Sequence, residues 1–371
     1  MLRKMVPYAT MRAKGCGQFS SHFGLLRRAR GWSLGDLAER VGFVSRQMLH
    51  KYETGASLPS PGVARRLASV LNVPIKTLFS EPPAEIVCSS VGYRHFFGLR
   101  RKEKLRIEES VRLALQPRIV LSSIFVPGSG RLPRKVSVRG TRDIEAAAAY
   151  LRRVWNLGGD PIAHLIACLE DRGVQVLLLN ADSRFDGTGL VVSDTSGTDL
   201  CWAVVVKKDV CAEHQRLSIA HELGHLLMRV PPSAQGTKQE EKYAFDFAGA
   251  FLAPADAVYR RVGHKRRQIR LEELLLLKKY FGMSVQAVLC RLLTLQIISD
   301  RYFTLWFREL GRRGWRTREP EETGPEESVW LRHAVLRLRS ERIKTAAEIR
   351  TLFAASFERD HVESVLAGKT A

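Results

Sequence analysis

The chain has 371 residues, of which 45% are hydrophobic and 26% are charged. This composition is typical of a soluble globular protein, and the length allows two or three domains with a sizeable core. No apolar run reaches about 18 residues and the N-terminus has no continuous apolar segment, which argues against a membrane span and against a secretory signal. Six cysteines without any CxxC spacing predict reduced thiols, so we expect a cytoplasmic protein.

The positive charge is concentrated in the first part of the chain. Residues 1–135 contain 24 Lys and Arg against 8 Asp and Glu, whereas residues 136–371 contain 35 against 30. A basic segment joined to a nearly neutral one indicates that the basic part meets a polyanion, and nucleic acid is the polyanion we expect. The alternative is a surface charge that only keeps the protein soluble.

Short helices dominate the N-terminal part. Residues 1–17 are expected to be a basic, poorly ordered tail and residues 18–83 a helical domain. Ser33 is predicted to cap a helix over 34–41 that Gly42 ends, and a second helix runs from Ser45 to Thr54. A third helix is expected over 63–71 and a short one up to Phe79. In and just before the second helix, the residues expected to face the domain core are Val44, Met48, Leu49 and Tyr52.

Two helices joined at a glycine are the helix-turn-helix arrangement, whose second helix reads base edges in the major groove. Gln47 is suited to a bidentate contact with adenine, Arg46 to a guanine or a phosphate, and Lys51 to a phosphate. The alternative is a protein-interaction module with a solvated polar face. The candidate DNA-binding residues are Ser45, Arg46, Gln47, His50 and Lys51.

Residues Ser33–Gly42, Ser45–Gly55 and Leu67–Pro74 resemble the XRE family of helix-turn-helix regulators, the phage repressor and Cro-like proteins. The resemblance implies an operator in double-stranded DNA as partner and a homodimer on that operator. Two departures affect the base contacts. Phe43 lengthens the turn by one residue, and Leu34 stands where many members have a phosphate-contacting glutamine.

The rest of the chain divides into three parts. Residues 84–139 are expected to be a basic linker with one helix, and the Pro127–Gly130 loop a flexible connection. Residues 140–300 are expected to form a domain with a few strands, and residues 301–371 a helical region interrupted by a polar stretch over 312–327. The predicted fold class is mainly α with a small β-sheet (α+β): an all-α helix-turn-helix domain, a zincin-like domain and a helical C-terminal piece.

Within 140–300, the elements follow from periodicity and turn residues. Helices are predicted over 141–155, 161–172, 271–281 and 285–293, the last two separated by the turn Gly282–Ser284. Strands are predicted over 174–179 and 202–206, with a turn at Asp186–Gly189 between them.

The most informative motif is His221-Glu222-Leu223-Gly224-His225 in an apolar helical segment, Arg216–Met228. Residues four apart stand on one face of a helix, so both imidazoles can bind a single Zn²⁺. Glu222 beside them is placed to take a proton from water. Two alternatives are histidines that only hydrogen-bond in a core and a site that binds metal without turnover.

A third ligand is expected from the next helix. Glu241 opens a segment whose inner face is predicted to carry Ala244, Ala248, Phe251 and Leu252, which would complete a His₂Glu site with one open position. Glu240 is the competing candidate. Tyr243 and Arg216 are the candidates for stabilising an oxyanion, whereas His214 and His264 are expected to be ordinary loop histidines.

Residues Arg216–Leu227 and Glu241–Pro254, with the lead-in Leu151–Pro161 and Leu169–Gly173, resemble the ImmA/IrrE family of bacterial metallopeptidase-like proteins. The resemblance implies His221, His225 and Glu241 as zinc ligands and Glu222 as general base. It also implies a repressor protein as substrate. Three interpretations remain open: a DNA-binding regulator with a peptidase or sensor domain, a dedicated protease that docks a repressor through its helix-turn-helix, and an antitoxin-like regulator with a silent metal site.

Overall fold

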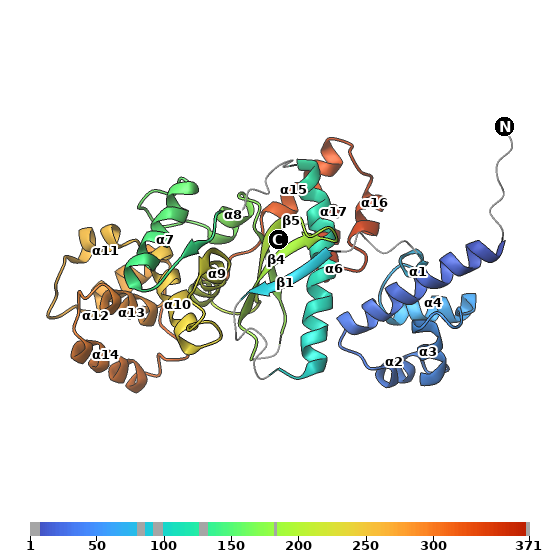
Figure 1. Ribbon diagram of the computed structural model, residues 1–371, viewed down its shortest axis with the longest axis horizontal. Helices are drawn as coiled ribbons and strands as arrows, with labels where there is room; N and C mark the ends of the chain where they lie inside the picture. The colour runs from blue at the N-terminus through green and yellow to red at the C-terminus, as the bar shows by residue number, and fades with distance from the viewer. Residues whose placement is uncertain (1–7, 80–85, 92–98, 126–132, 182–183, 369–371) are drawn as a thin grey trace. The chain divides into compact units, whose positions relative to one another are not determined.

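The computed structural model describes residues 8–79, 86–91, 99–125, 133–181 and 184–368, with the backbone alone for 8–18. The fold is mainly α with a small sheet (Figure 1), which confirms the expected fold class. The described residues form two compact units. None of their helices is long and apolar enough to cross a bilayer.

The first unit takes in the chain up to Ile86, Leu99–Pro127 and Leu331–Ala371. Part of the expected basic linker and part of the expected C-terminal region thus belong to the same unit as the N-terminal helices. Its helices are α1 (Tyr8–Ala29), α2 (Leu34–Val41), α3 (Arg46–Glu53), α4 (Pro61–Val70), α5 (Ile75–Phe79), α6 (Arg101–Phe125), α15 (Trp330–Ser340), α16 (Ala346–Leu352) and α17 (Arg359–Leu366).

The helix-turn-helix elements begin and end where capping residues predict. The Ser33 side chain accepts from the Asp36 N–H and the Asp36 carboxylate accepts from the Ser33 N–H, which forms a capping box at α2. Gly42 ends α2 with φ of 91°, in the left-handed region that glycine tolerates. Ser45 caps α3 through the N–H of Met48.

Two expectations for the N-terminal part are wrong. The chain is helical from Tyr8 onward, because residues 8–17 continue the helix that buries Phe19 and Phe23, so only residues 1–7 of the expected tail lie outside the described part. Met48 is 37% exposed, whereas Val44, Leu49 and Tyr52 are buried as expected. A helix of two turns buries one stripe, and Met48 lies about 100° around the helix from Leu49.

Helix α6 packs on α1 within this unit. Arg28 binds Glu109 at 2.9 Å, and Ser110 donates to the carbonyl oxygen of Ala29. Further along α6, Arg118 is 1% exposed and binds Glu358 next to α17 at 2.7 Å. A buried charge keeps its place only when it is paired, so this contact joins the C-terminal helices to α6.

The second unit takes in Val87–Gly98 and Gly128–Trp330. The Pro127–Gly130 loop lies outside the described residues. Its helices are α7 (Thr141–Val154), α8 (Leu165–Glu170), α9 (Ala212–Leu227), α10 (Lys238–Leu252), α11 (Ala255–Val262), α12 (Leu271–Phe281), α13 (Val285–Thr294) and α14 (Asp300–Arg312). Its strands are β1 (Ile86–Val91), β2 (Val136–Ser137), β3 (Gln175–Leu179), β4 (Gly187–Asp194), β5 (Asp199–Lys207) and β6 (Met228–Arg229).

The main sheet has the order β1-β4-β5-β3, with β5 antiparallel to β4 and parallel to β3. The turn predicted at Asp186–Gly189 is wrong, because Gly187 already pairs with Val206 at the start of β4. Glycines there indicate a close backbone approach and not a turn. A Cβ at Gly189 would lie 3.0 Å from the carbonyl oxygen of Glu222, since α9 crosses β4 at this point.

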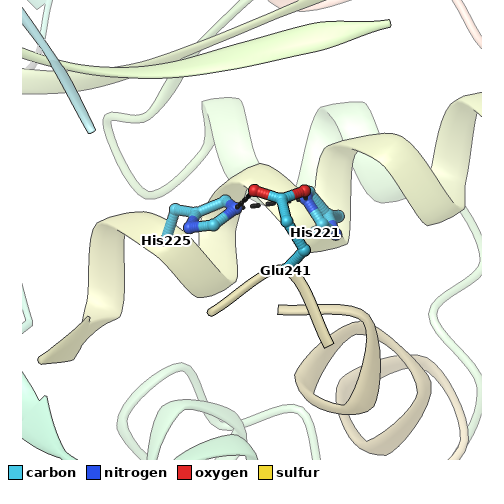
Figure 2. Close-up of side chains that lie close together, drawn as sticks. All are labelled: His221, His225 and Glu241. Atoms are coloured by element: carbon cyan, nitrogen blue, oxygen red, sulfur yellow. Dashed lines mark hydrogen bonds and ion pairs between the residues drawn. The ribbon is translucent and has the colours of Figure 1, made fainter. Parts of the chain in front are cut away.

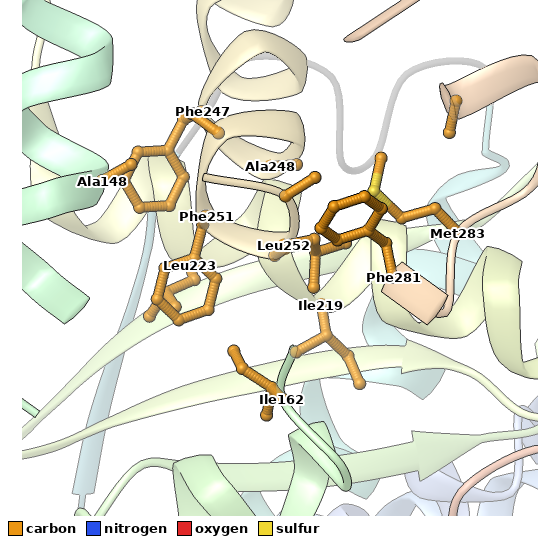
Figure 3. Packing of buried hydrophobic residues seen from close by; sticks show 14 of the residues in the cluster. Ala148, Ile162, Ile219, Leu223, Phe247, Ala248, Phe251, Leu252, Phe281 and Met283 are labelled. Atoms are coloured by element: carbon orange, nitrogen blue, oxygen red, sulfur yellow. The ribbon is translucent and has the colours of Figure 1, made fainter. Parts of the chain in front are cut away.

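Helix α10 lies against α9 and α7 over a large apolar core (Figure 3). Leu223 of α9 and Ala248 and Phe251 of α10 are fully buried in it, the latter two as the sequence predicts for the inner face of α10. Phe247 is also fully buried but was not predicted. The approach is tightest at Gly224, where an added Cβ would lie 2.9 Å from the Phe247 ring. A glycine is needed at this point for the two helices to pack so closely.

The polar stretch after α14 is held in place by buried carboxylates. Glu319 accepts the backbone N–H groups of Val285 and Gln286 at the start of α13. Glu326 accepts the N–H of Ile166 and binds Arg216 of α9. We call residues 315–328 the strap, because these contacts fasten it across α13, α8 and α9.

Gly224→Ala is expected to lower the free energy of unfolding by about 1–3 kcal/mol, since overpacking a rigid core costs that much. Urea unfolding of the full chain measures it. Phe247→Leu in the same chain should recover part of the loss, and Gly140→Ala is the control because nothing lies within 4 Å of a Cβ there. Equal stability of Gly224→Ala and wild type would contradict the packing described for α9 and α10.

Candidate functional site

Two imidazoles and one carboxylate converge between α9 and α10 (Figure 2). The Nε2 atoms of His221 and His225 are 3.1 Å apart. The Oε2 atom of Glu241 lies 3.5 Å from the Nε2 of His221, and its Oε1 atom lies 3.6 Å from the Nε2 of His225. The structure thus brings together the three predicted ligands.

The separations of these atoms fit a zinc ion. Ligand atoms about 2.0–2.1 Å from zinc, at the tetrahedral angle, stand roughly 3.3–3.4 Å apart. The two imidazole nitrogens are 3.1 Å apart, and each has a different Glu241 oxygen at 3.5 or 3.6 Å. With one ligand atom taken from each residue, the three atoms lie within 4.8 Å of one another. Within the described residues, His221, His225 and Glu241 are also the group whose ligand atoms lie close enough to hold one metal ion. The donor set of two imidazoles and a carboxylate is the set that catalytic zinc sites use.

Glu240, the competing candidate, faces the other side of His225. Its Oε1 is 3.8 Å from the Nδ1 of His225, and its Oε2 accepts the N–H of Gly236 at 2.7 Å. The nearby His225 imidazole lowers the pKa of Glu240. A carboxylate at the non-ligating nitrogen orients an imidazole and sets its tautomer, so this geometry suits Glu240 to supporting the ligand and not to being one.

Glu222 lies on the sheet side of α9. The backbone N–H of Gly189 lies near its carboxylate and lowers its pKa, and a Cβ at Gly187 would lie 3.3 Å from its Oε1. Burial raises the pKa of Glu222, against the opposing effect of the two imidazoles. The two glycines of β4 are therefore part of the site, and the Gly-x-Gly spacing was the sequence signal for them.

His225 shows how the site balances charge. Its burial lowers the pKa of the imidazole, but the neighbouring carboxylates of Glu240, Glu222 and Glu241 outweigh burial and raise it. The Nδ1 of His221 has no carboxylate like Glu240 beside it: this atom is buried and has no hydrogen-bond partner among the described residues. The ring of Phe245 instead covers that imidazole, with ring centroids 4.2 Å apart. Phe245 was missed because a half-exposed aromatic has no sequence signature.

Both expected oxyanion stabilisers have other roles. Arg216 is buried and donates to the carbonyl oxygens of Gly282 and Ile162 as well as to Glu326. The Tyr243 hydroxyl donates to the carbonyl oxygen of Arg139 at 2.9 Å. Arg216 satisfies carbonyl groups that burial would otherwise leave unpaired, and Tyr243 donates to a carbonyl oxygen of an exposed residue, so neither donor is directed at the metal site as expected.

The two histidines expected to be ordinary loop residues, His214 and His264, are not part of this cluster. His214 is exposed on the first turn of α9, not in a loop, and His264 is exposed after α11 with its ring stacked on Tyr259 at 4.4 Å.

In the first unit, all five candidate DNA-binding residues are exposed at the start of α3 or along it. Glu53, at the end of the same helix, accepts from the Nε and Nη2 of Arg27 at 2.9 and 2.7 Å. Arg66 of α4 donates to the carbonyl oxygens of Arg40 and Val41. The first contact fixes α3 to α1 and the second fixes α4 to α2, while the polar face of α3 remains exposed.

The zinc content of variants distinguishes Glu241 from Glu240 as the third ligand. Purified wild type is expected to bind one equivalent of zinc, and Glu241→Gln or His221→Ala to lose it, because each removes one of three ligands. Glu240→Gln should keep the ion with affinity lowered by about 10–100-fold at most. Elemental analysis with a competitive chelator measures both. Loss of zinc in Glu240→Gln with full retention in Glu241→Gln would reverse the assignment.

Comparison with known proteins agrees with this geometry. Residues 25–78 match a helix-turn-helix family model, and residues 170–293 match the model of an IrrE N-terminal-like domain, a peptidase family. The HTH-type transcriptional regulator SutR of Escherichia coli (strain K12) is 46% identical over 57 residues, 15% of this chain and 32% of SutR. The chain thus spans about a third of that relative. It joins a helix-turn-helix domain to an IrrE-like peptidase domain.

Proposed function

We propose that the chain is a DNA-binding transcriptional regulator whose second unit is a zinc-dependent peptidase that cleaves a regulator protein. The observation that carries the proposal is the convergence of His221, His225 and Glu241 beside Glu222. The helix-turn-helix and IrrE-like matches support the pairing of the two activities. Its place of action would be the cytoplasm, where its DNA target lies.

The metal would be held by the Nε2 atoms of His221 and His225 and by the Glu241 carboxylate. A zinc ion bound there supplies Lewis acidity toward a peptide carbonyl and lowers the pKa of water. Glu240 keeps His225 oriented through its Nδ1. Two imidazoles and a carboxylate leave one coordination position for substrate or solvent.

Glu222 is the proton carrier in this proposal. Its carboxylate accepts a proton from water as the peptide carbonyl is attacked, and then delivers it to the leaving amine nitrogen. The nearby Gly189 N–H, on the sheet side, favours the charged form of the carboxylate. Since Glu222 is 8% exposed, solvent competes little with the substrate for that proton.

The DNA-binding role rests on the exposed polar face of α3. Gln47 and Arg46 lie in its first turn, which is the part of a recognition helix that reaches base edges. The excess of Lys and Arg in residues 1–135 supplies the attraction to phosphates. A homodimer on a palindromic operator is the arrangement that a single short recognition helix favours.

A second candidate function is metal sensing without turnover. It is favoured by the engagement of Arg216 and Tyr243 elsewhere, which leaves neither available to stabilise an oxyanion. In that case, zinc would control DNA binding and Glu222 would have no kinetic role.

Glu222→Gln decides between these candidates. The variant is expected to retain one zinc and to lose peptidase activity by about 10²–10⁴-fold, because the amide cannot accept the proton. New N-termini, identified by mass spectrometry in cells expressing wild type or variant, measure cleavage. Identical sets of N-termini would support the sensing function over peptidase activity.

Two substitutions in α3 test the DNA-binding face. Gln47→Ala should cost about 1–3 kcal/mol on a selected operator and leave the salt dependence unchanged, because a base contact is lost. Lys51→Ala should weaken binding to all sequences and lower the salt slope by about 1. Fluorescence anisotropy on selected and scrambled duplexes measures both, with Glu272→Gln as a control outside the first unit. Unchanged affinity and specificity in Gln47→Ala would refute the assigned recognition face.

A further inference from the structure

A cavity of about 670 Å³ lies in the second unit beside the metal site. Its walls come from the first turns of α9, the outer face of α10, α13 and the strap. Glu241 lies in one wall, whereas neither metal-binding histidine nor Glu222 is among the described residues that line it. The volume is that of a site for a small organic molecule. Its apolar and aromatic lining comes from Leu217, Phe245, Met283, Ala287, Phe307 and Trp315.

The buried charges in the wall do not balance. Lys278 binds Glu213 at 3.4 Å and Glu319 at 3.2 Å, and all three side chains are at most 5% exposed. One ammonium therefore faces two carboxylates. Glu319 is compensated further by the two N–H groups at the start of α13, at 2.7 and 3.1 Å. The excess negative charge remains on Glu213.

Glu213 is also poorly hydrogen-bonded. Its Oε1 has only long contacts, 3.3 and 3.4 Å to the hydroxyl and the N–H of Thr323. Its Oε2 is buried and has no hydrogen-bond partner among the described residues. Burial raises the pKa of the neighbouring Cys211 thiol, the backbone of His214 lowers it, and the carboxylates of Glu213 and Glu322 raise it further. A buried carboxylate with one oxygen lacking a donor is costly, so Glu213 calls for a further donor.

Of the other cations of the wall, Lys238 and Arg316 are exposed, and the remaining two are paired. Lys242 binds Asp246 at 2.6 Å, and Arg291 binds Glu145 in addition to the carbonyl oxygen of Ala253. An anionic ligand would find no unpaired buried cation here, whereas a cationic one would complete the pairing of Glu213.

We propose that this cavity binds an organic cation, a protonated amine or guanidinium carried on an apolar or aromatic body. The cationic head would pair with Glu213, and the body would pack among Leu217, Phe307 and Trp315. Such a group comes either from a free small molecule or from a Lys or Arg side chain of a peptide. The site needs neither zinc nor peptidase activity, so it stands apart from the function proposed above.

Calorimetry on the full chain tests the chemistry. Phenethylamine and N-acetylarginine amide are the cationic probes, and 3-phenylpropionate and 2-phenylethanol are the anionic and neutral analogues. At least one cationic probe is expected to bind, and more tightly than either analogue. Binding by phenethylamine alone indicates a free small molecule, binding by the arginine amide alone indicates a peptide side chain, and both outcomes support the site.

A matched pair of variants locates the ligand. Glu213→Gln should weaken binding of the cationic probe by at least about tenfold, since it removes the charge but keeps the volume. Glu272→Gln, an exposed glutamate on α12, should bind as wild type does. Equal binding of the cation by wild type and Glu213→Gln, or tighter binding of 3-phenylpropionate, would overturn the proposal.

Native cysteines provide a measurement that needs no variant. Cys290 is exposed and lines the cavity, whereas Cys88 lies on β1 and does not. A saturating cationic probe should slow alkylation of Cys290 several-fold and leave the rate at Cys88 unchanged, as followed by mass spectrometry. If the Cys290 rate does not change while calorimetry detects binding, the cation binds elsewhere and the proposed site is wrong.

Discussion

The close packing of α10 on α9 is the constraint on which the proposed chemistry depends. His221 and His225 are placed by one helix, but the third donor comes from a second helix and must arrive within a few tenths of an ångström. Gly224 allows that approach, because any larger residue would meet the Phe247 ring. The fully buried Ala244 and Ala248 keep the rest of the α10 interface small as well. Glu241, one turn before Ala244, then lies opposite both imidazoles.

Much of this arrangement follows from local sequence rules. A spacing of four residues puts His221 and His225 on one helical face whatever the fold around them. The apolar spacing after Glu241 identifies the buried face of α10. It therefore favours Glu241 over Glu240 as the third ligand, in agreement with the distances from their carboxylate oxygens to the imidazole nitrogens. In the first unit, Ser33, Gly42 and Ser45 mark the ends of α2 and the start of α3, since caps depend on neighbouring residues only.

Other features depend on contacts between distant segments, which one sequence does not reveal. Gly187 and Gly189 read as a turn, although they form the part of β4 that α9 crosses. The strap reads as a polar spacer, because the buried partners of Glu319 and Glu326 lie far away in the sequence. For the same reason, Arg216 and Tyr243 seemed available for catalysis when their donors are used by backbone carbonyls. The role of a polar side chain depends on its partners in the tertiary structure. Apolar periodicity and helix caps can be recognised without knowing those partners.

The central claim is that two imidazoles and one carboxylate hold a zinc ion with a position left for solvent. X-ray absorption at the zinc edge, on the purified full chain loaded with one equivalent, tests it most directly. The account predicts a shell of nitrogen and oxygen ligands at about 2.0–2.2 Å, with an imidazole signature for two histidines and a coordination number of four. Sulfur ligands at about 2.3 Å, or a site without imidazole, would contradict it.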